Sequence, residues 1–326
     1  MGEALFAGLV AATVAAALGP AVIGWLYRLK FGQQIRQVGP QSHLKKAGTP
    51  TMGGVLIFVA LAVATLLFAG SSLVVPYILF TTLGYALIGF VDDWIKVKAK
   101  RSLGLKARQK LAAQVLVALV PALFALADPD LGNRILLPFT HQLVALPNWL
   151  FGLLAVGTIV GSANAVNETD GLDGLAAGAV AIAAFVYAII ALVHGAGPAH
   201  AYGLAVFAAA LGGACLGFVW FNAHPAQVFM GDTGSLGLGA ALGALAVFTQ
   251  SELVLIIVGG LFVLEVLSVI VQVSYFRLTH GKRILKMSPL HHHFEQIGWA
   301  EPKIVIRFWL LALVFGIVGL YSVASV

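Results

Sequence analysis

Ten apolar segments, each close to the length that crosses a bilayer, divide this chain of 326 residues. A spanning helix needs about 20 mostly apolar residues. Only 10% of the residues are charged and 60% are hydrophobic, a balance that excludes an ordinary soluble domain. We therefore predict an all-α polytopic membrane protein that forms a single domain over residues 1–326. The predicted spans are 4–27, 52–69, 73–91, 111–127, 146–165, 174–193, 201–221, 234–249, 253–276 and 304–323.

The basic residues are distributed very unevenly among the loops between these spans. Of 19 Lys and Arg residues, 18 lie in the segments 28–46, 96–110 and 277–307, which follow the first, third and ninth spans, and Arg134 is the exception. Lys and Arg are retained on the cytoplasmic side during insertion, so the three loops share that face and both termini are predicted outside. The net charge of +6 reflects this orientation, and we predict no nucleic-acid partner.

The cytoplasmic loops also carry separate polar clusters, of which the first is Asp92-Asp93 at the end of the third span. Two adjacent carboxylates repel each other, and burial adds a desolvation cost. Basic neighbours from Lys96 onward offset that cost, and a divalent cation offsets it better, because Mg²⁺ binds one or two carboxylates together with substrate phosphates. A solvated helix end is the simpler interpretation of the pair taken alone.

Two further clusters follow the fifth and seventh spans. Residues 164–175 contain three acids, two amides and two glycines, which together suit a metal or a phosphorylated ligand. Residues 222–235 end in Gly-Asp-Thr-Gly-Ser at the start of a predicted helix. Backbone donors there favour an anion, while Asp232 favours a cation that the anion shares. Each cluster by itself is also explained as a helix N-cap.

Three consecutive histidines, His291 to His293, stand in the last basic loop, and Glu265 lies within the ninth span. Successive helical positions point about 100° apart, so the three imidazoles do not easily share one zinc ion, and contacts with phosphate fit better. Glu265 is costly inside a membrane, and it marks either a break in the helix or a polar interior contact. Lys45 and Lys46 suit phosphate but are equally ordinary cytoplasmic anchors.

Taken together, the clusters describe one site, because all the loops that carry them are predicted on the cytoplasmic side. A carboxylate core with a basic rim is suited to phosphoryl transfer from a nucleotide, in which catalysis is mainly positioning and charge neutralisation. A lipid phosphate acceptor is confined to the bilayer, so its site belongs where helices meet the inner interface. Asp92 and Asp93 end a helix there.

Five motifs are specific in combination, although none is specific alone: GTPTMGG at 48–54, VDD at 91–93, NxxDGLDGL at 167–175, FMGDTGS at 229–235 and LHHHFE at 290–295. Over residues 33–299 the chain resembles the MraY family of phospho-N-acetylmuramoyl-pentapeptide transferases, within the polyprenyl-phosphate N-acetylhexosamine-1-phosphate transferases. The resemblance implies transfer of phospho-MurNAc-pentapeptide from UDP-MurNAc-pentapeptide to undecaprenyl phosphate, giving lipid I and UMP. It places the reaction at the cytoplasmic face of the bacterial inner membrane.

The resemblance also implies a broken ninth helix, a homodimer in the lipid bilayer, and Mg²⁺ as cofactor with Mn²⁺ as a substitute. It implies that Asp232, Asp92 and Asp93 form the metal site, and that Asp92 or Asp93 deprotonates the lipid phosphate. His291 is implied as a catalytic contact to the phosphate or sugar. The implied substrate-binding residues are Lys46, Thr51, Asn167, Asp170, Gly171, Leu172, Asp173, Asn222, Phe229, Gln272, His292, His293, Arg108 and Lys110.

Alternatives remain at two levels. The nearest is a UDP-GlcNAc:polyprenyl-phosphate GlcNAc-1-phosphate transferase with the same Mg²⁺ core, although the uninterrupted histidine run favours the muramoyl branch. A transporter is the alternative from another class, because intramembrane acids are frequent in transporters. Within the transferase interpretation, the lipid phosphate attacks the donor directly, or an Asp first forms a phosphoryl-enzyme intermediate. Direct attack is the hypothesis that we favour.

Overall fold

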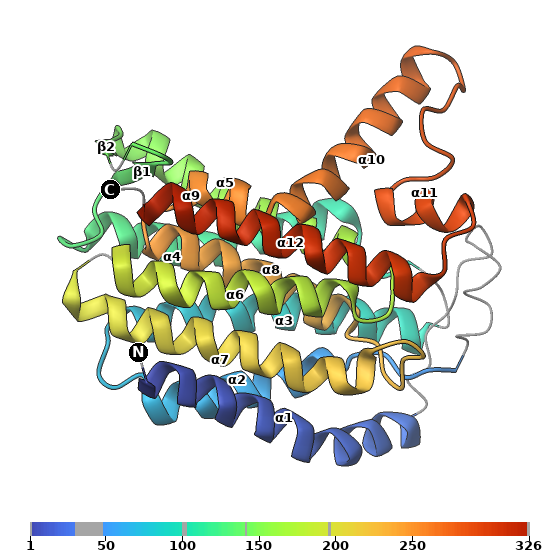
Figure 1. Cartoon of the computed structure of the whole chain (residues 1–326), viewed down its shortest axis with the longest axis horizontal. Helices are drawn as coiled ribbons and strands as arrows, with labels where there is room; N and C mark the ends of the chain where they lie inside the picture. Colours follow the sequence, from blue (N-terminus) through green and yellow to red (C-terminus); the bar gives the residue numbers. More distant parts are fainter. Residues whose placement is uncertain (1, 30–47, 100–102, 141, 195–196, 325–326) are drawn as a thin grey trace.

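A computed structural model describes residues 2–29, 48–99, 103–140, 142–194 and 197–324, so Lys46 and nearly all of the first basic loop lie outside the described residues. Within these ranges the chain forms a helical bundle with one small hairpin (Figure 1). The elements are α1 (Gly2–Arg28), α2 (Gly54–Phe68), α3 (Val74–Lys98), α4 (Ala107–Ala127), β1 (Arg134–Leu137), β2 (Gln142–Ala145), α5 (Asn148–Thr169), α6 (Leu175–His194), α7 (Pro198–Asn222), α8 (Gly231–Phe248), α9 (Glu252–Val258), α10 (Gly260–Leu278), α11 (Leu290–Gln296) and α12 (Glu301–Ala324).

The helices confirm the predicted all-α polytopic membrane protein. Among the described residues, nine helices are long and apolar enough to cross a membrane, and α2, with 15 residues, is shorter. The second predicted span begins earlier than α2 because its first residues extend along a distant loop. Phe229 N donates to Pro50 O at 2.8 Å, and Gly53 N donates to Phe229 O at 2.8 Å. These bonds join the start of α2 to the segment before α8.

The ninth predicted span is divided between α9 and α10, as expected for a broken helix. The break lies at Gly259 and Gly260, before Glu265 is reached. A Cβ added at Gly260 would lie 2.6 Å from the Phe315 ring, so a glycine lets α12 pack closely against the break. Beyond the break, α10 projects away from the other helices and leads to α11 (Figure 1).

The centre of the bundle is α8, along which α3 and α5 make extensive contacts. Its most apolar stretch is 89% buried, whereas that of α10 is 22% buried. Close approach depends on small residues, because a Cβ at Gly89 of α3 would collide with the carbonyl oxygen of Asp232. On the other side, Ser162 Oγ of α5 donates to Gly239 O at 2.7 Å. The start of α8 therefore packs closely against α3, and its middle is bonded to α5.

Both termini lie at the same end of the bundle as the hairpin, and α11 lies at the opposite end (Figure 1). The strands are antiparallel, with Leu136 opposite Leu143, and Leu136 N donates to Gln250 O at 2.7 Å in the turn after α8. The hairpin was not predicted, because strands of four residues leave only a weak alternating pattern.

Candidate active site

Three carboxylates from two helices meet at the end of the bundle that faces away from the termini. Asp92 and Asp93 lie near the end of α3, and Asp232 lies in the first turn of α8. One oxygen from each lies within 4.8 Å of the other two. Asp92 and Asp93 are buried, with 3% and 4% of their surface exposed. The structure thus brings together the three acids that were predicted as a metal site.

Two lysines offset part of the negative charge of this acid cluster. Lys96 Nζ lies 2.6 Å from Asp92 Oδ2, 3.1 Å from Asp232 Oδ2 and 3.7 Å from Asp93 Oδ1. Lys110 Nζ, from the first turns of α4, lies 2.5 Å from Asp232 Oδ2. Lys110 was predicted as part of the anionic rim, whereas Lys96 was considered only as a basic neighbour. Lys96 follows Asp92 by four residues, which places both side chains on one helix face. This spacing could have predicted their ion pair.

Backbone and hydroxyl donors fix the orientation of the two acids on α3. Leu105 N donates to Asp92 Oδ1 at 2.7 Å. Thr233 donates twice to Asp93 Oδ2, through its backbone N at 2.9 Å and its Oγ1 at 2.8 Å. The backbone donor lies in the first turn of α8, where the helix dipole also favours a negative charge. The Gly-Asp-Thr-Gly-Ser motif therefore receives a carboxylate from α3 in this structure.

Asp232 is held from α5 as well as by the lysines. Asn167 Nδ2 donates to Asp232 Oδ1 at 3.3 Å and to Ser235 Oγ at 2.7 Å. Asn167 was predicted for substrate binding, and its amide group lies at the acid cluster. Arg108, predicted for the rim, is exposed at the start of α4.

The turn before α8 requires a glycine next to the cluster. Gly231 has φ +69°, and a Cβ there would lie 2.5 Å from Asp93 Oδ2 and 2.7 Å from Thr51 Oγ1. This left-handed conformation strains other residues, and the space is already filled. Thr51, predicted for substrate binding, thus lies beside the acids. Phe229, also predicted, is half-buried just before this turn.

The loop between α5 and α6 is fastened by two other parts of the chain. Asp173 N donates to Glu301 Oε1 at 2.7 Å, and Gly174 N donates to Asn222 Oδ1 at 3.0 Å. His224 Nδ1 lies 2.9 Å from Asp173 Oδ2. Asn222 was predicted to line the nucleotide site, and here its buried amide holds the loop. The other predicted loop residues are Asp170 and Gly171, which are half-buried, and Leu172, which is buried.

The three histidines of α11 point to three separate partners, as their helical spacing predicted. His291 Nδ1 lies 3.2 Å from Glu265 Oε2, and both side chains are fully buried. His292 Nδ1 lies 2.7 Å from Glu295 Oε2, whereas His293 Nδ1 accepts a hydrogen bond at 3.2 Å from a backbone N–H of the preceding loop. Glu265 therefore makes a polar interior contact, and the nearby helix break is a separate feature at the glycines.

His291 also lies directly against the α5–α6 loop, since a Cβ at Gly171 would collide with its imidazole ring. This contact brings α11 to the same site as the loop. Gln272, predicted for substrate binding, is buried in α10. Its Oε1 accepts from Ile284 N at 3.1 Å and Leu285 N at 3.0 Å, and its Nε2 donates to Leu285 O at 3.0 Å. Gln272 thereby holds the segment that leads to α11.

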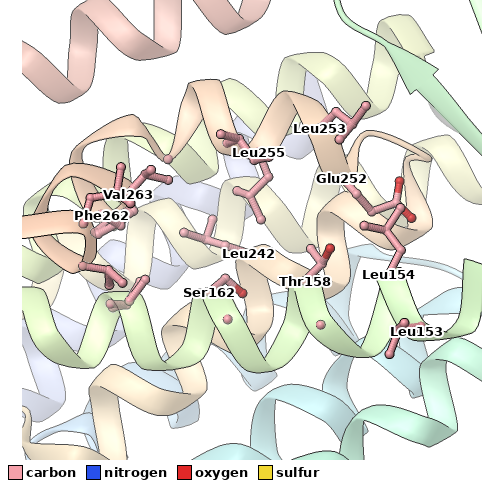
Figure 2. A pocket seen from close by; sticks show the side chains of 18 of the residues that line it. Leu153, Leu154, Thr158, Ser162, Leu242, Glu252, Leu253, Leu255, Phe262 and Val263 are labelled. Carbon is pink, nitrogen blue, oxygen red and sulfur yellow. The ribbon is translucent and has the colours of Figure 1, made fainter. Parts of the chain in front are cut away.

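An apolar groove of about 540 Å³ runs along α5, beside α9 and α10. Figure 2 shows Leu154, Thr158 and Ser162 on one side, with Leu255 and Phe262 on the other. At one end the groove is lined by Ala165 and Val166, which immediately precede Asn167, the residue that contacts the acid cluster. The same end is lined by Val266 and Leu267, which follow Glu265. The groove therefore runs along α5 to a point next to Asn167, which contacts the acid cluster.

Comparisons with known proteins find similar sequences over most of the chain. Residues 75–250 match the model of glycosyl transferase family 4, and residues 46–58 match the phospho-N-acetylmuramoyl-pentapeptide-transferase signature 1. A protein named phospho-N-acetylmuramoyl-pentapeptide-transferase from Moorella thermoacetica is 53% identical over 98% of both chains. Proteins of the same name from Desulforamulus reducens and Syntrophus aciditrophicus are 51% and 46% identical, over 93% and 97% of this chain and 90% and 91% of their own.

Proposed function

We propose a catalytic mechanism from the premise that this chain belongs to the phospho-N-acetylmuramoyl-pentapeptide-transferase family. It transfers phospho-MurNAc-pentapeptide from UDP-MurNAc-pentapeptide to a polyprenyl phosphate, which yields lipid I and UMP. The acceptor that we propose is undecaprenyl phosphate. The observation that carries the mechanism is the meeting of Asp92, Asp93 and Asp232 within 4.8 Å of one another, beside Lys96 and Lys110.

The donor set of the acid cluster fits a divalent cation, because Mg²⁺ prefers carboxylate oxygens together with substrate phosphates. Asp92, Asp93 and Asp232 are the residues that would hold it, with Mn²⁺ as a substitute. When bound, the cation supplies charge neutralisation for the diphosphate of the donor. Lys96 lies among the same oxygens, so a bound cation would compete with its ammonium group for these carboxylates.

The lipid phosphate attacks the β-phosphate of the nucleotide donor directly in this proposal. Asp92 or Asp93 accepts the proton of the lipid phosphate, an oxygen of that phosphate bonds to the β-phosphorus, and the bond to UMP breaks. Ion pairs and hydrogen bonds fix the orientation of Asp92, Asp93 and Asp232, as direct attack requires of the groups that position the two phosphates. Isolation of a phosphosugar adduct that forms and turns over at a competent rate would overturn direct attack.

The donor lies between the acid cluster, the α5–α6 loop and α11 in this proposal. Asp170, Gly171 and Asp173 supply polar groups to the nucleotide. His291 contacts the phosphate or sugar, because its ring packs on Gly171 and is backed by the buried carboxylate of Glu265. The remaining substrate-binding assignments are Lys46, Thr51, Arg108, Lys110, Asn167, Leu172, Asn222, Phe229, Gln272, His292 and His293.

The isoprenyl chain of the acceptor lies in the apolar groove of Figure 2, with its phosphate toward the acids. Three features support this part of the proposal: the lining is mainly aliphatic, only 28% and 22% of the most apolar stretches of α5 and α10 are buried, and the groove ends beside Asn167. The chain is a multi-pass membrane protein. We place it as one domain in the bacterial inner membrane, with the active site cytoplasmic, both termini outside and two copies forming a homodimer.

The test is UMP release in detergent from UDP-MurNAc-pentapeptide and undecaprenyl phosphate, with and without Mg²⁺. We expect release only with both substrates and the cation, and restoration by Mn²⁺ after chelation. UDP-GlcNAc in place of the muramoyl donor separates this reaction from the GlcNAc-1-phosphate alternative, because we expect no UMP from it. Release that persists after complete chelation would contradict the proposed metal site.

A further inference from the structure

The first residue of α12, Glu301, contacts both the α5–α6 loop and the segment between α7 and α8. Its Oε1 accepts the backbone N–H of Asp173 at 2.7 Å, and its Oε2 lies 3.4 Å from His224 Nδ1. The carboxylate is mostly buried, with 8% of the side chain exposed. Neither Glu301 nor His224 was assigned a role by the sequence motifs.

His224 completes a connected set of three side chains. Its Nδ1 lies 2.9 Å from Asp173 Oδ2, and Ala226 N donates to the same oxygen at 3.2 Å. The Asp173 side chain is only 3% exposed, whereas that of His224 is 39% exposed. One imidazole N–H thus faces two carboxylates, which compensates part of the cost of burying them.

The position of Glu301 along the chain gives this network its importance. Glu301 follows α11 by only four connecting residues, and α11 carries the histidine that packs on Gly171. A contact between Glu301 and Asp173 therefore ties the histidine helix to the loop from a second point. Asn222 holds the next residue, Gly174, from the end of α7. The loop is thus clamped between α7 and α12.

We infer that Glu301 and His224 are positioning residues, which hold the Asp170–Gly174 loop in the conformation that binds the nucleotide end of the donor. The inference rests on the proposed function of this loop. Neither residue needs to touch the reacting phosphates, because both act through Asp173. Loss of the clamp therefore weakens donor binding, while the lipid acceptor and the acid cluster are unaffected.

Steady-state kinetics of four variants test the inference. For Glu301→Ala we expect the KM for UDP-MurNAc-pentapeptide to rise roughly tenfold, the loss typical of a hydrogen bond to a charged group, while kcat and the KM for undecaprenyl phosphate stay within about twofold. Glu301→Gln keeps an acceptor for Asp173 N–H and should give a smaller rise. His224→Ala should also raise the donor KM, and His224→Asn, whose amide N–H replaces Nδ1–H, should restore it.

Two results would overturn the inference: an unchanged donor KM in Glu301→Ala and His224→Ala, or an equal rise in the KM of both substrates. If Glu301→Ala fails to fold, the His224 pair still decides, because that side chain is partly exposed. Ile306→Ala, at an exposed position of α12, controls for general effects on this helix. Absence of UMP release from the unaltered protein would instead refute the proposed function itself.

Discussion

The two halves of the active site are built in opposite ways. The acid half lies where α3 meets α8, the most enclosed helix of the bundle, and each carboxylate there has several partners. The histidine half is carried by α10, which projects from the bundle, and by α11, which lies beside the end of α12 (Figure 1). It is joined to the rest by individual contacts such as His291 with Gly171 and Glu301 with Asp173.

This difference suggests that the two halves have different roles in the reaction. Charge neutralisation during phosphoryl transfer benefits from groups that are already oriented, and the packed acid half supplies them. Recognition of a large donor requires a surface that is accessible before binding, and the histidine half includes α10, the least buried of the nine candidate spans among the described residues. Substitutions in the acid half should therefore affect the chemical step and the metal, whereas those in the histidine half should spare the metal.

The largest effect is expected for Asp232→Asn, which removes the charge paired with Lys96 and Lys110. UMP release should fall by roughly a hundredfold or more, as for the loss of other preorganised charge-stabilising groups. The variant should still fold, because the amide fits the same space. Asp130→Asn, an exposed acid near the hairpin, is the matched control. An active Asp232→Asn protein would remove the acid cluster from the mechanism.

Gly89→Ala tests whether the close packing of the acid half is required. Its methyl group would collide with the carbonyl of Asp232, and overpacking of this kind typically costs about 1–3 kcal/mol. We expect a lower unfolding temperature in detergent together with lost activity. Gly24→Ala on α1, where a Cβ meets nothing within 4 Å, should leave both unchanged. Equal behaviour of the two variants would show that the approach of α3 to α8 tolerates a larger side chain.

Glu265→Gln tests the histidine half. The buried carboxylate lies 3.2 Å from His291 Nδ1, and we expect its loss to lower kcat roughly tenfold by misplacing the ring. The Mg²⁺ concentration at half-maximal rate should not change. Glu295→Gln, which alters the more exposed partner of His292, should have a smaller effect. A shift in the Mg²⁺ dependence of Glu265→Gln would mean that the two halves are not separate.

The smallest expected effect is stabilisation by the metal itself. Mg²⁺ at ten times its Kd adds about 1.4 kcal/mol to the free energy of unfolding if it binds only the folded state. This increment, measured as the difference in unfolding temperature with Mg²⁺ and with chelator, should disappear in Asp232→Asn and persist in Glu265→Gln. Its persistence in Asp232→Asn would locate the ion elsewhere.

Several features of the site were predictable from neighbouring residues. The four-residue spacing of Asp92 and Lys96 places them on one helix face, so their contact was predictable. The different directions of the three histidines follow from helical geometry. The Glu265 contact and the helix break were predicted as alternatives, and the structure contains both, at different residues. The hairpin, the Glu301 contact and the role of Asn222 as a loop anchor were not predicted, because their partners lie far away in the chain.

Hydropathy and charge along the chain were sufficient to specify the membrane spans, because each span depends only on the composition of about 20 consecutive residues. The motifs were sufficient to indicate phosphosugar transfer. Which donor holds each carboxylate was decided only by the packing of α3, α5 and α8, since Thr233 lies 140 residues from Asp93. Local periodicity carries no information about such a pairing, which arises when glycines allow distant helices to approach and buried acids must find partners.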